Sequence, residues 1–369
     1  MQEFEDAAQF DPKFALAYVG QAETQLRMYR LRKGEKNLLQ RAHTAAEKAR
    51  DLNPQLAAAH VVLGGIFTDL GQNDDAIREL ETALQRDPRD PAPYLELGRL
   101  YGRLGRHTEA EDLFAKAIAQ RPGDWRTYRA AATYYTGVQQ LAEAERYSRK
   151  VLDLAPDNSE GYMNLGALLL KLGQRKEAER MLLKAQDLNP TASGYSNLGY
   201  LYLAQHRFPE AVAVMEKSTA IAEQQQSGEF RIWGNLGDAY WLAHANPEKA
   251  RQAWSRAATI VRDRLGAAPV QDPELLSYLA KFEAKAGDLG PASRHLDTAL
   301  AQGKSSANTQ YEAALAYAVL GRADDSLRAL AAAIQLKYPI DEIQQAPELG
   351  TLRGDRRYSL LFPSPSAKP

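Results

Sequence analysis

The chain has 369 residues, of which 44% are hydrophobic and 25% are charged, a composition typical of a folded globular protein. Its formal net charge is −1, from 46 basic and 47 acidic side chains, so a general nucleic-acid binder with a basic excess is not expected. The absence of cysteine excludes disulfides and thiolate zinc sites, and it leaves both cytoplasm and periplasm open as compartments. No apolar run approaches the roughly 18 residues of a membrane span, so direct membrane insertion is not expected.

The first predicted element is a single helix near residues 1–14. Phe4 and Ala7 supply its apolar positions, and Pro12 ends it because proline cannot continue a helix. These residues match only the second half of a longer unit that recurs along the chain. We therefore expect residues 1–14 to be half of such a unit, joined to a further domain.

The recurring unit is clearest in residues 91–124. Eight positions define it: Tyr94, Leu97, Gly98, Tyr101, Ala110, Phe114, Ala117 and Pro122. The same residue types return every 34 residues, as the first position shows in His60, Tyr94, Tyr128 and Tyr162. A fixed period of this length is typical of a repeat architecture, in which neighbouring units stack.

Each unit predicts a pair of antiparallel helices. Apolar residues at positions 4, 7, 8 and 11 of the unit form one helical stripe, and those at positions 20, 24 and 27 form a second. Glycine near position 15 predicts a left-handed cap between the two helices, at Gly71, Gly105, Gly173 and Gly321. Because one pair cannot bury its own apolar stripes, the pairs are expected to stack on one another.

This pattern resembles the tetratricopeptide-repeat family. The resemblance implies an all-α fold, a right-handed superhelical solenoid of antiparallel helix pairs with about nine and a half repeats over residues 1–340. After the half unit, the repeats are expected near residues 15–56, 57–90, 91–124, 125–158, 159–191, 192–229, 230–272, 273–306 and 307–340. Residues 341–362 break the period and are predicted to cap the last repeat, and residues 363–369 are predicted to be a disordered tail.

Both ends of the chain carry a second resemblance. Residues 10–18 and residues 347–358 resemble the ends of the tetratricopeptide regions at the C-terminus of bacterial receptor-like serine/threonine kinases and related signalling proteins. This resemblance implies a bacterial protein. The catalytic motifs of the kinases themselves are absent from the sequence.

No catalytic, metal or cofactor site is predicted. The six histidines, at positions 43, 60, 107, 206, 244 and 295, have no metal-ligand spacing, and no HExxH motif occurs. Gly303, Lys304 and Ser305 resemble the end of a phosphate-binding loop, but the earlier glycine that such a loop needs is Thr298. The chain is therefore not expected to be an enzyme.

The candidate binding residues lie on one face of the first helices. The family resemblance implies that positions 2, 5, 6, 9 and 13 line a concave groove, and the helical period places these positions on a shared face. A basic run at these positions comprises Arg99, Arg103, Arg126, Arg129 and Lys171. The groove is predicted to contain, in addition, Asn164, Asn197, Tyr200, Arg231 and Asn235.

Three of these residues, Asn164, Asn197 and Asn235, occupy position 6 of successive units. An amide side chain offers both a donor and an acceptor, so such a series could hold the backbone of an extended peptide. The basic run would meet acidic groups of that peptide. Two alternatives stay open: the arginines form an ordinary solvated face, or Asn-Leu-Gly is simply common in these repeats.

The predicted function is that of a non-catalytic protein–protein interaction scaffold, whose groove binds an acidic, extended segment of a partner protein. One alternative is the sensor or regulatory arm of a larger signalling enzyme, such as a serine/threonine kinase. Another is a self-assembly module. The sequence leaves the partner and the oligomeric state open.

Overall fold

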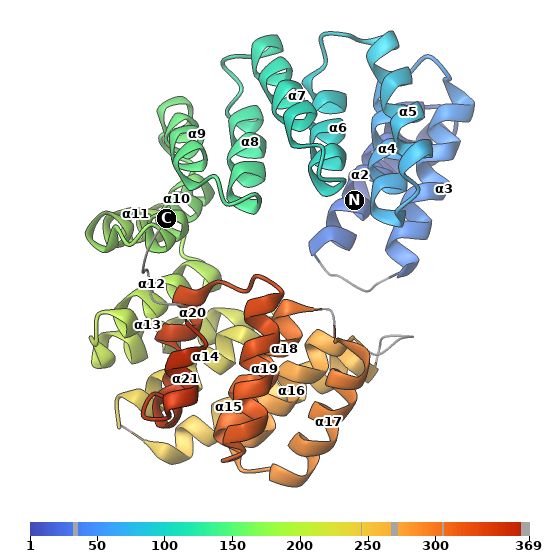
Figure 1. Cartoon of the computed structure of the whole chain (residues 1–369). Coiled ribbons are helices and arrows are strands. Elements are labelled where there is room, and N and C mark those ends of the chain that lie inside the picture. Colours follow the sequence, from blue (N-terminus) through green and yellow to red (C-terminus); the bar gives the residue numbers. More distant parts are fainter. Residues whose placement is uncertain (32–35, 245, 267–271, 305, 363–369) are drawn as a thin grey trace, which may run out of the picture. The chain divides into compact units, whose positions relative to one another are not determined.

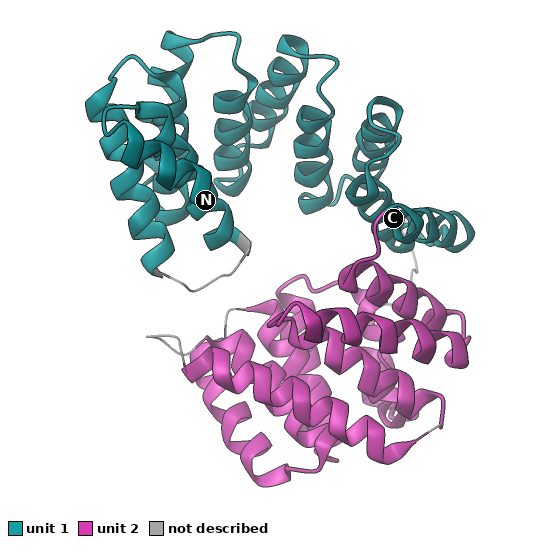
Figure 2. Cartoon of the chain, turned by 180° about the vertical axis from the view of Figure 1, so that it is seen from behind, with its two compact units in different colours: residues 1–188 teal, residues 189–369 magenta. Residues whose placement is uncertain are grey.

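The structure, a computed structural model, describes residues 1–31, 36–244, 246–266, 272–304 and 306–362. Within these ranges every regular element is a helix, so the predicted all-α fold class is confirmed. The chain divides into two compact units, unit 1 with residues 1–188 and unit 2 with residues 189–369 (Figure 1, Figure 2). The predicted tail, residues 363–369, lies outside the described residues.

Unit 1 begins with α1 (Gln2–Phe10), which packs on the first of a series of helix pairs. The pairs are α2 (Ala15–Leu31) with α3 (Lys36–Leu52), α4 (Ala57–Leu70) with α5 (Asn73–Arg86), α6 (Pro91–Arg103) with α7 (His107–Gln120), α8 (Trp125–Gly137) with α9 (Leu141–Leu154), and α10 (Ser159–Lys171) with α11 (Arg175–Leu188).

Unit 2 continues with further helix pairs and ends in three short helices. The pairs are α12 (Ala192–Ala204) with α13 (Phe208–Gln224), α14 (Phe230–Leu242) with α15 (Pro247–Gly266), α16 (Pro273–Ala286) with α17 (Leu289–Gln302), and α18 (Ala307–Val319) with α19 (Ala323–Gln335). The short helices are α20 (Ile340–Gln345), the 3-10 helix η1 (Pro347–Leu352) and α21 (Arg356–Leu360).

The pair α10 and α11 shows why these sequences form closely packed helices. Leu165 and Leu182 are buried almost completely between the helices, as the apolar spacing predicts. A methyl group added at Gly166 would lie 2.7 Å from Leu182 Cγ, so the Leu182 side chain of α11 leaves no room for a larger residue there. Gly173 ends α10 with a φ of 73°, which confirms the left-handed cap predicted there.

The first helices of neighbouring pairs also touch one another, α2 with α4, α4 with α6 and α6 with α8 in unit 1, and α12 with α14 and α16 with α18 in unit 2. They form a surface that we call the first-helix face. In unit 1 this face comprises α2, α4, α6, α8 and α10, and in unit 2 it comprises α12, α14, α16 and α18. The second helices cover the other side of each pair, so the predicted binding positions lie on the first-helix faces.

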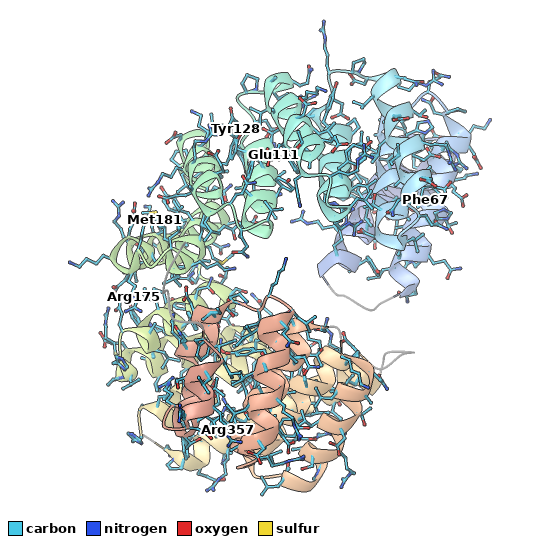
Figure 3. All side chains as sticks on the ribbon, in the orientation of Figure 1. Phe67, Glu111, Tyr128, Arg175, Met181 and Arg357 are labelled. Atoms are coloured by element: carbon cyan, nitrogen blue, oxygen red, sulfur yellow. The ribbon has the colours of Figure 1, made fainter. Side chains whose placement is uncertain are left out.

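The C-terminal segment, residues 339–362, packs onto the last helices of unit 2. Ile343, Leu349, Leu352 and Tyr358 are buried in one apolar cluster with residues of α18 and α19. Arg357 of α21, labelled in Figure 3, donates from Nη1 to Asp324 of α19 at 2.7 Å. This packing supports the proposal that residues 341–362 cap the last helix pair.

A buried ion-pair cluster ties the same segment to α14 and α16. Lys285 Nζ lies 2.7 Å from Asp238 Oδ1 and also contacts Glu348, and the side chains of Lys285 and Glu348 are only 7% and 10% exposed. Burial alone would raise the pKa of Glu348, but the charges of Lys285 and then Lys281 lower it to about 2. Burial alone would lower the pKa of Lys285, but Asp238 and Glu348 hold it above its ordinary value. Both groups are therefore charged in the folded chain.

The close crossing in α11 generates a stability prediction. Ala178 is fully buried at the crossing with α10, so Ala178→Phe should force the helices apart and lower the free energy of unfolding by roughly 1–3 kcal/mol. Lys176→Ala, at an exposed position of the same helix, should change it by less than about 0.5 kcal/mol. Urea unfolding followed by circular dichroism measures both. Equal effects of the two substitutions would show that the crossing of α10 and α11 does not limit the size of residue 178.

The depressed pKa of Glu348 generates a pH prediction. A carboxyl group whose folded pKa of about 2 lies below its ordinary 4.5 stabilises the fold above 4.5, and this stabilisation is lost as the pH falls towards 2. Near neutral pH, Glu348→Gln should therefore lower the free energy of unfolding by about 1–3 kcal/mol. The difference between wild type and variant should shrink as the pH falls from 4.5 to 2. A difference that stays constant over this range in urea titrations would contradict the ion pair.

Candidate functional site

Arg99 and Arg103, on α6, belong to an ion-pair cluster that spans α2, α4 and α6. Asp69 accepts from Arg30 Nε at 2.6 Å and from Arg99 Nη1 at 3.2 Å. Glu96 accepts from Arg99 Nη2 at 2.6 Å and from Arg30 Nη1 at 3.2 Å. Arg103 Nη1 lies 3.5 Å from Asp69. Three guanidinium groups thus share two carboxylates, and the cluster carries one excess positive charge.

The electrostatics of this cluster keep its members charged. Burial would raise the pKa of Glu96, but Arg99 and Arg30 hold it below its ordinary value. The pKa of Arg103 is lowered, first by burial and then by the charge of Arg99. An arginine pKa starts so far above neutrality that the group remains protonated. The excess charge therefore lies towards Arg103, whose side chain is 45% exposed.

Arg126 and Arg129 both lie close to the indole ring of Trp125 at the start of α8. Their Cζ atoms are 5.2 and 5.3 Å from the ring centre of Trp125, within the range of cation–π attraction. Asp124 caps the helix, accepting from the backbone N–H of Arg126 at 3.0 Å, and lies 3.3 Å from the Nη1 of the same residue. Arg129 Nη1 donates to Glu160 Oε1 of α10 at 2.9 Å. Both arginines are thus oriented by neighbouring groups.

An open cleft of about 370 Å³ lies between α8 and α10, and Ser148 and Val151 of α9 also line it. Its polar lining includes Arg129, Thr133, Thr136, Ser148, Asn164 and Lys171. Thr133 and Thr136 donate their hydroxyl hydrogens to backbone carbonyls of α8, so their oxygens keep lone pairs that can accept a hydrogen bond. The cleft therefore combines cations, an amide and hydroxyl acceptors on a largely apolar floor.

Asn164 and Lys171 provide the available polar groups of this cleft. They are seven residues apart on α10, which places them on one helical face, and both are exposed. In the part of the chain that the structure describes, neither side chain forms a hydrogen bond or an ion pair. The cleft can thus offer a ligand an ammonium group and an amide.

The other candidates, Asn197, Tyr200, Arg231 and Asn235, lie in unit 2. Asn235 Nδ2 donates to Ser196 Oγ at 3.1 Å. Arg231 Nη2 donates to the hydroxyl of Tyr278 at 3.2 Å and lies 3.7 Å from Glu274. The three predicted asparagines are thus divided between the units, with Asn164 in unit 1 and the other two in unit 2.

The sequence analysis placed the arginines on the correct helices but did not predict that carboxylates of the same face would pair with them. The spacing of Glu96 and Arg99, three residues apart on one helix, is a local signal for an ion pair. Asp69 has no such signal, because its partner Arg30 lies 39 residues away and reaches it only through packing of α2 on α4. The basic run is therefore largely compensated within the chain, except at Lys171 and in part at Arg103.

No helix among the described residues has the length and apolar character needed to cross a membrane. In the same residues, no group of three or more histidine or acidic side chains could hold a metal ion. Two histidines lie close to a single carboxylate each: His60 Nδ1 is 2.6 Å from Glu79, and His295 Nδ1 is 2.7 Å from Glu283.

Known proteins share this fold. No curated protein sequence matches the chain. Among solved structures, the human IFIT1 dimer with PPP-AAAA is similar with a TM-score of 0.53 and 18% identity, over 81% of this chain and 66% of that one. A tetratricopeptide repeat protein from Parabacteroides merdae is similar with a TM-score of 0.50 and 16% identity, over 70% of this chain and 98% of that one. At these identities the likeness shows the fold alone.

Family models supply the sequence evidence. Models described as tetratricopeptide repeat match residues 67–133, 136–199 and 191–224. These ranges cover helices from the end of α4 to the end of α13, and the helix pairs on both sides continue the same paired arrangement. Residues 67–133 and 136–224 thus match models of the tetratricopeptide repeat, in agreement with the 34-residue period of the sequence.

Proposed function

We propose that the chain is a non-catalytic interaction scaffold and that the first-helix face of unit 1 binds an extended, acidic segment of a partner protein. Tetratricopeptide repeats generally act as non-catalytic scaffolds for protein–protein interaction. The observation that carries the proposal is the cleft between α8 and α10, where Lys171 and Asn164 have no partner within the described residues. A ligand with carboxylates and peptide groups would satisfy both.

The spacing of these two residues sets the length of ligand that they can hold. Seven residues of α-helix extend about 10 Å. An extended peptide covers the same distance in about three residues, at about 3.3 Å per residue. In our proposal the amide of Asn164 grips a peptide group, and Lys171 meets an acidic side chain about three residues away. Arg129, oriented by Glu160 and Trp125, contributes a second positive group on the opposite wall.

Arg99, Arg103 and Arg126 have a secondary role in this proposal. Arg99 is matched by Asp69 and Glu96, so its principal effect is to hold the cluster in place. Arg103 is nearly half exposed and carries the uncompensated charge of the cluster, so it can attract a second carboxylate of the ligand. Arg126 is exposed beside Asp124 and adds to the local positive potential.

The unit 2 candidates remain part of the proposal as a separate surface. Asn197 and Asn235 lie on α12 and α14, and Asn235 is already held by Ser196. Tyr200 is 51% exposed, and Arg231 keeps a side chain that is 53% exposed. We propose that these residues contact a ligand of unit 2, independently of the cleft in unit 1.

The test selects peptides and then measures variants. A random peptide library displayed on phage should yield binders enriched in aspartate and glutamate. In fluorescence anisotropy, Lys171→Ala should weaken the binding of a selected peptide by about 3- to 10-fold at low salt, and by less as salt screens the charge. Asn164→Ala should weaken it by a similar factor at all salt concentrations, because a neutral hydrogen bond depends little on salt.

Lys184→Ala is the matched control, because Lys184 is an exposed lysine of α11 outside the cleft. It should leave affinity unchanged. If Lys171→Ala and Lys184→Ala have the same effect, the ligand does not lie in the cleft. The alternative of self-assembly predicts a mass that rises with concentration in light scattering, and a regulatory arm of a signalling kinase predicts selected peptides that match kinase segments.

A further inference from the structure

The first-helix face of unit 2 contains a charged site made by three helices. On α16, Tyr278, Lys281 and Lys285 are spaced three and four residues apart and so share one face. Lys281 Nζ lies 2.5 Å from Glu312 Oε2 of α18, and Lys285 Nζ lies 2.7 Å from Asp238 Oδ1 of α14. Two cations and two carboxylates thus line the face where α14, α16 and α18 meet.

The chain's own C-terminal segment occupies this site. Glu348, on η1, contacts Lys285 Nζ, and Leu349 and Leu352 are buried against α18 and its neighbours. Earlier in the same segment, the backbone carbonyl of Glu342 accepts a hydrogen bond from the hydroxyl of Tyr311 of α18 at 3.4 Å. The segment therefore contacts the face as a bound peptide would, through one acidic side chain, two leucines and a backbone carbonyl.

We propose that the first-helix face of unit 2 is a second peptide-binding site. It is specific for an acidic residue that is followed by leucines one and four positions later, as Leu349 and Leu352 follow Glu348. Residues 339–362 occupy this site as a displaceable internal ligand. A partner segment with the same pattern binds when it displaces them, so the C-terminal segment acts as an autoinhibitor. This inference goes beyond the proposed function, because it concerns a different unit and a different set of residues.

The charge arrangement permits displacement. When the segment leaves, Lys285 keeps Asp238 as its counter-ion and Lys281 keeps Glu312, so neither lysine is left buried and unpaired. The released Glu348 carboxylate is solvated by water. The electrostatic penalty is thus the loss of one ion pair, offset by hydration, and in this proposal the leucines of the partner replace the apolar contacts of Leu349 and Leu352.

The segment also holds its own shape. Arg353 Nη2 donates to the backbone carbonyls of Gln344 and Ala346, at 3.1 and 2.9 Å. Asp355 accepts from the backbone N–H of Arg357 at 2.8 Å and so caps α21. Because these bonds lie within the segment, it can leave and return as a preformed element, and its connection to α19 is the short link through Lys337 and Tyr338.

The test uses the full-length chain and a labelled synthetic peptide of residues 339–362. The variant Leu349→Ala with Leu352→Ala weakens the internal copy, so it should bind the peptide at least 10-fold more tightly than wild type does in fluorescence anisotropy. A peptide with Glu348→Gln should bind this variant about 10-fold more weakly than the native peptide. Leu183→Ala, an exposed leucine of unit 1, is the control and should bind the peptide as wild type does.

Hydrogen exchange of the wild-type chain gives an independent measurement that needs no variant to fold. Amides of residues 340–360 should exchange faster than those of α18 and α19, because the segment opens locally. If the C-terminal segment, α18 and α19 exchange only together, the proposal is overturned. It is also overturned if the folded double variant binds neither the native peptide nor the Glu348→Gln peptide, or binds the two equally. None of these outcomes depends on the cleft in unit 1, so a failure here leaves the Lys171 experiment to be judged separately.

Discussion

The two helices of each pair cross so closely that small residues are needed where they meet. At Gly166 the backbone of α10 lies so near Leu182 of α11 that any side chain would collide with it, and Ala178 is fully buried beside the same crossing. Such an approach buries the apolar stripes of both helices and favours small residues at the crossing. Each pair still exposes an apolar edge, which is covered by a neighbouring pair or, at α18 and α19, by the C-terminal segment.

Stacking of the pairs then decides where charge is placed. With the apolar stripes turned into the pairs, the remaining side of each first helix carries polar residues, and these gather on the first-helix face of each unit. Arg30 of α2, Asp69 of α4 and Glu96 of α6 meet there although they belong to three different pairs. The face is therefore a structural seam held by ion pairs, and it gathers charged side chains from three helix pairs.

The two units use this face in different ways. In unit 1 the cleft between α8 and α10 is open, and Lys171 and Asn164 have no partner among the described residues. In unit 2, Glu348 of the C-terminal segment contacts Lys285, and Leu349 is fully buried in the terminal cluster. The same physical arrangement, a cation on a first helix facing an acidic group of an added segment, is available in the first unit and satisfied internally in the second.

The helices and their pairing could be predicted from the sequence alone. Those properties follow from residues close together in the chain: the apolar spacing within one helix, the glycine that caps it, and the small residue that admits its partner, as at Gly166, Gly173 and Ala178.

The charges that remain available for a ligand could not be predicted in the same way. Several ion pairs join residues that are far apart in the chain. Arg30 pairs with Asp69, 39 residues away, and with Glu96, 66 residues away, and Lys285 pairs with Glu348. Their formation depends on the rotation and offset between stacked helix pairs, and no local spacing encodes these. For that reason the sequence predicted a continuous basic run, whereas the folded chain compensates most of it and leaves Lys171 as the clearest available cation.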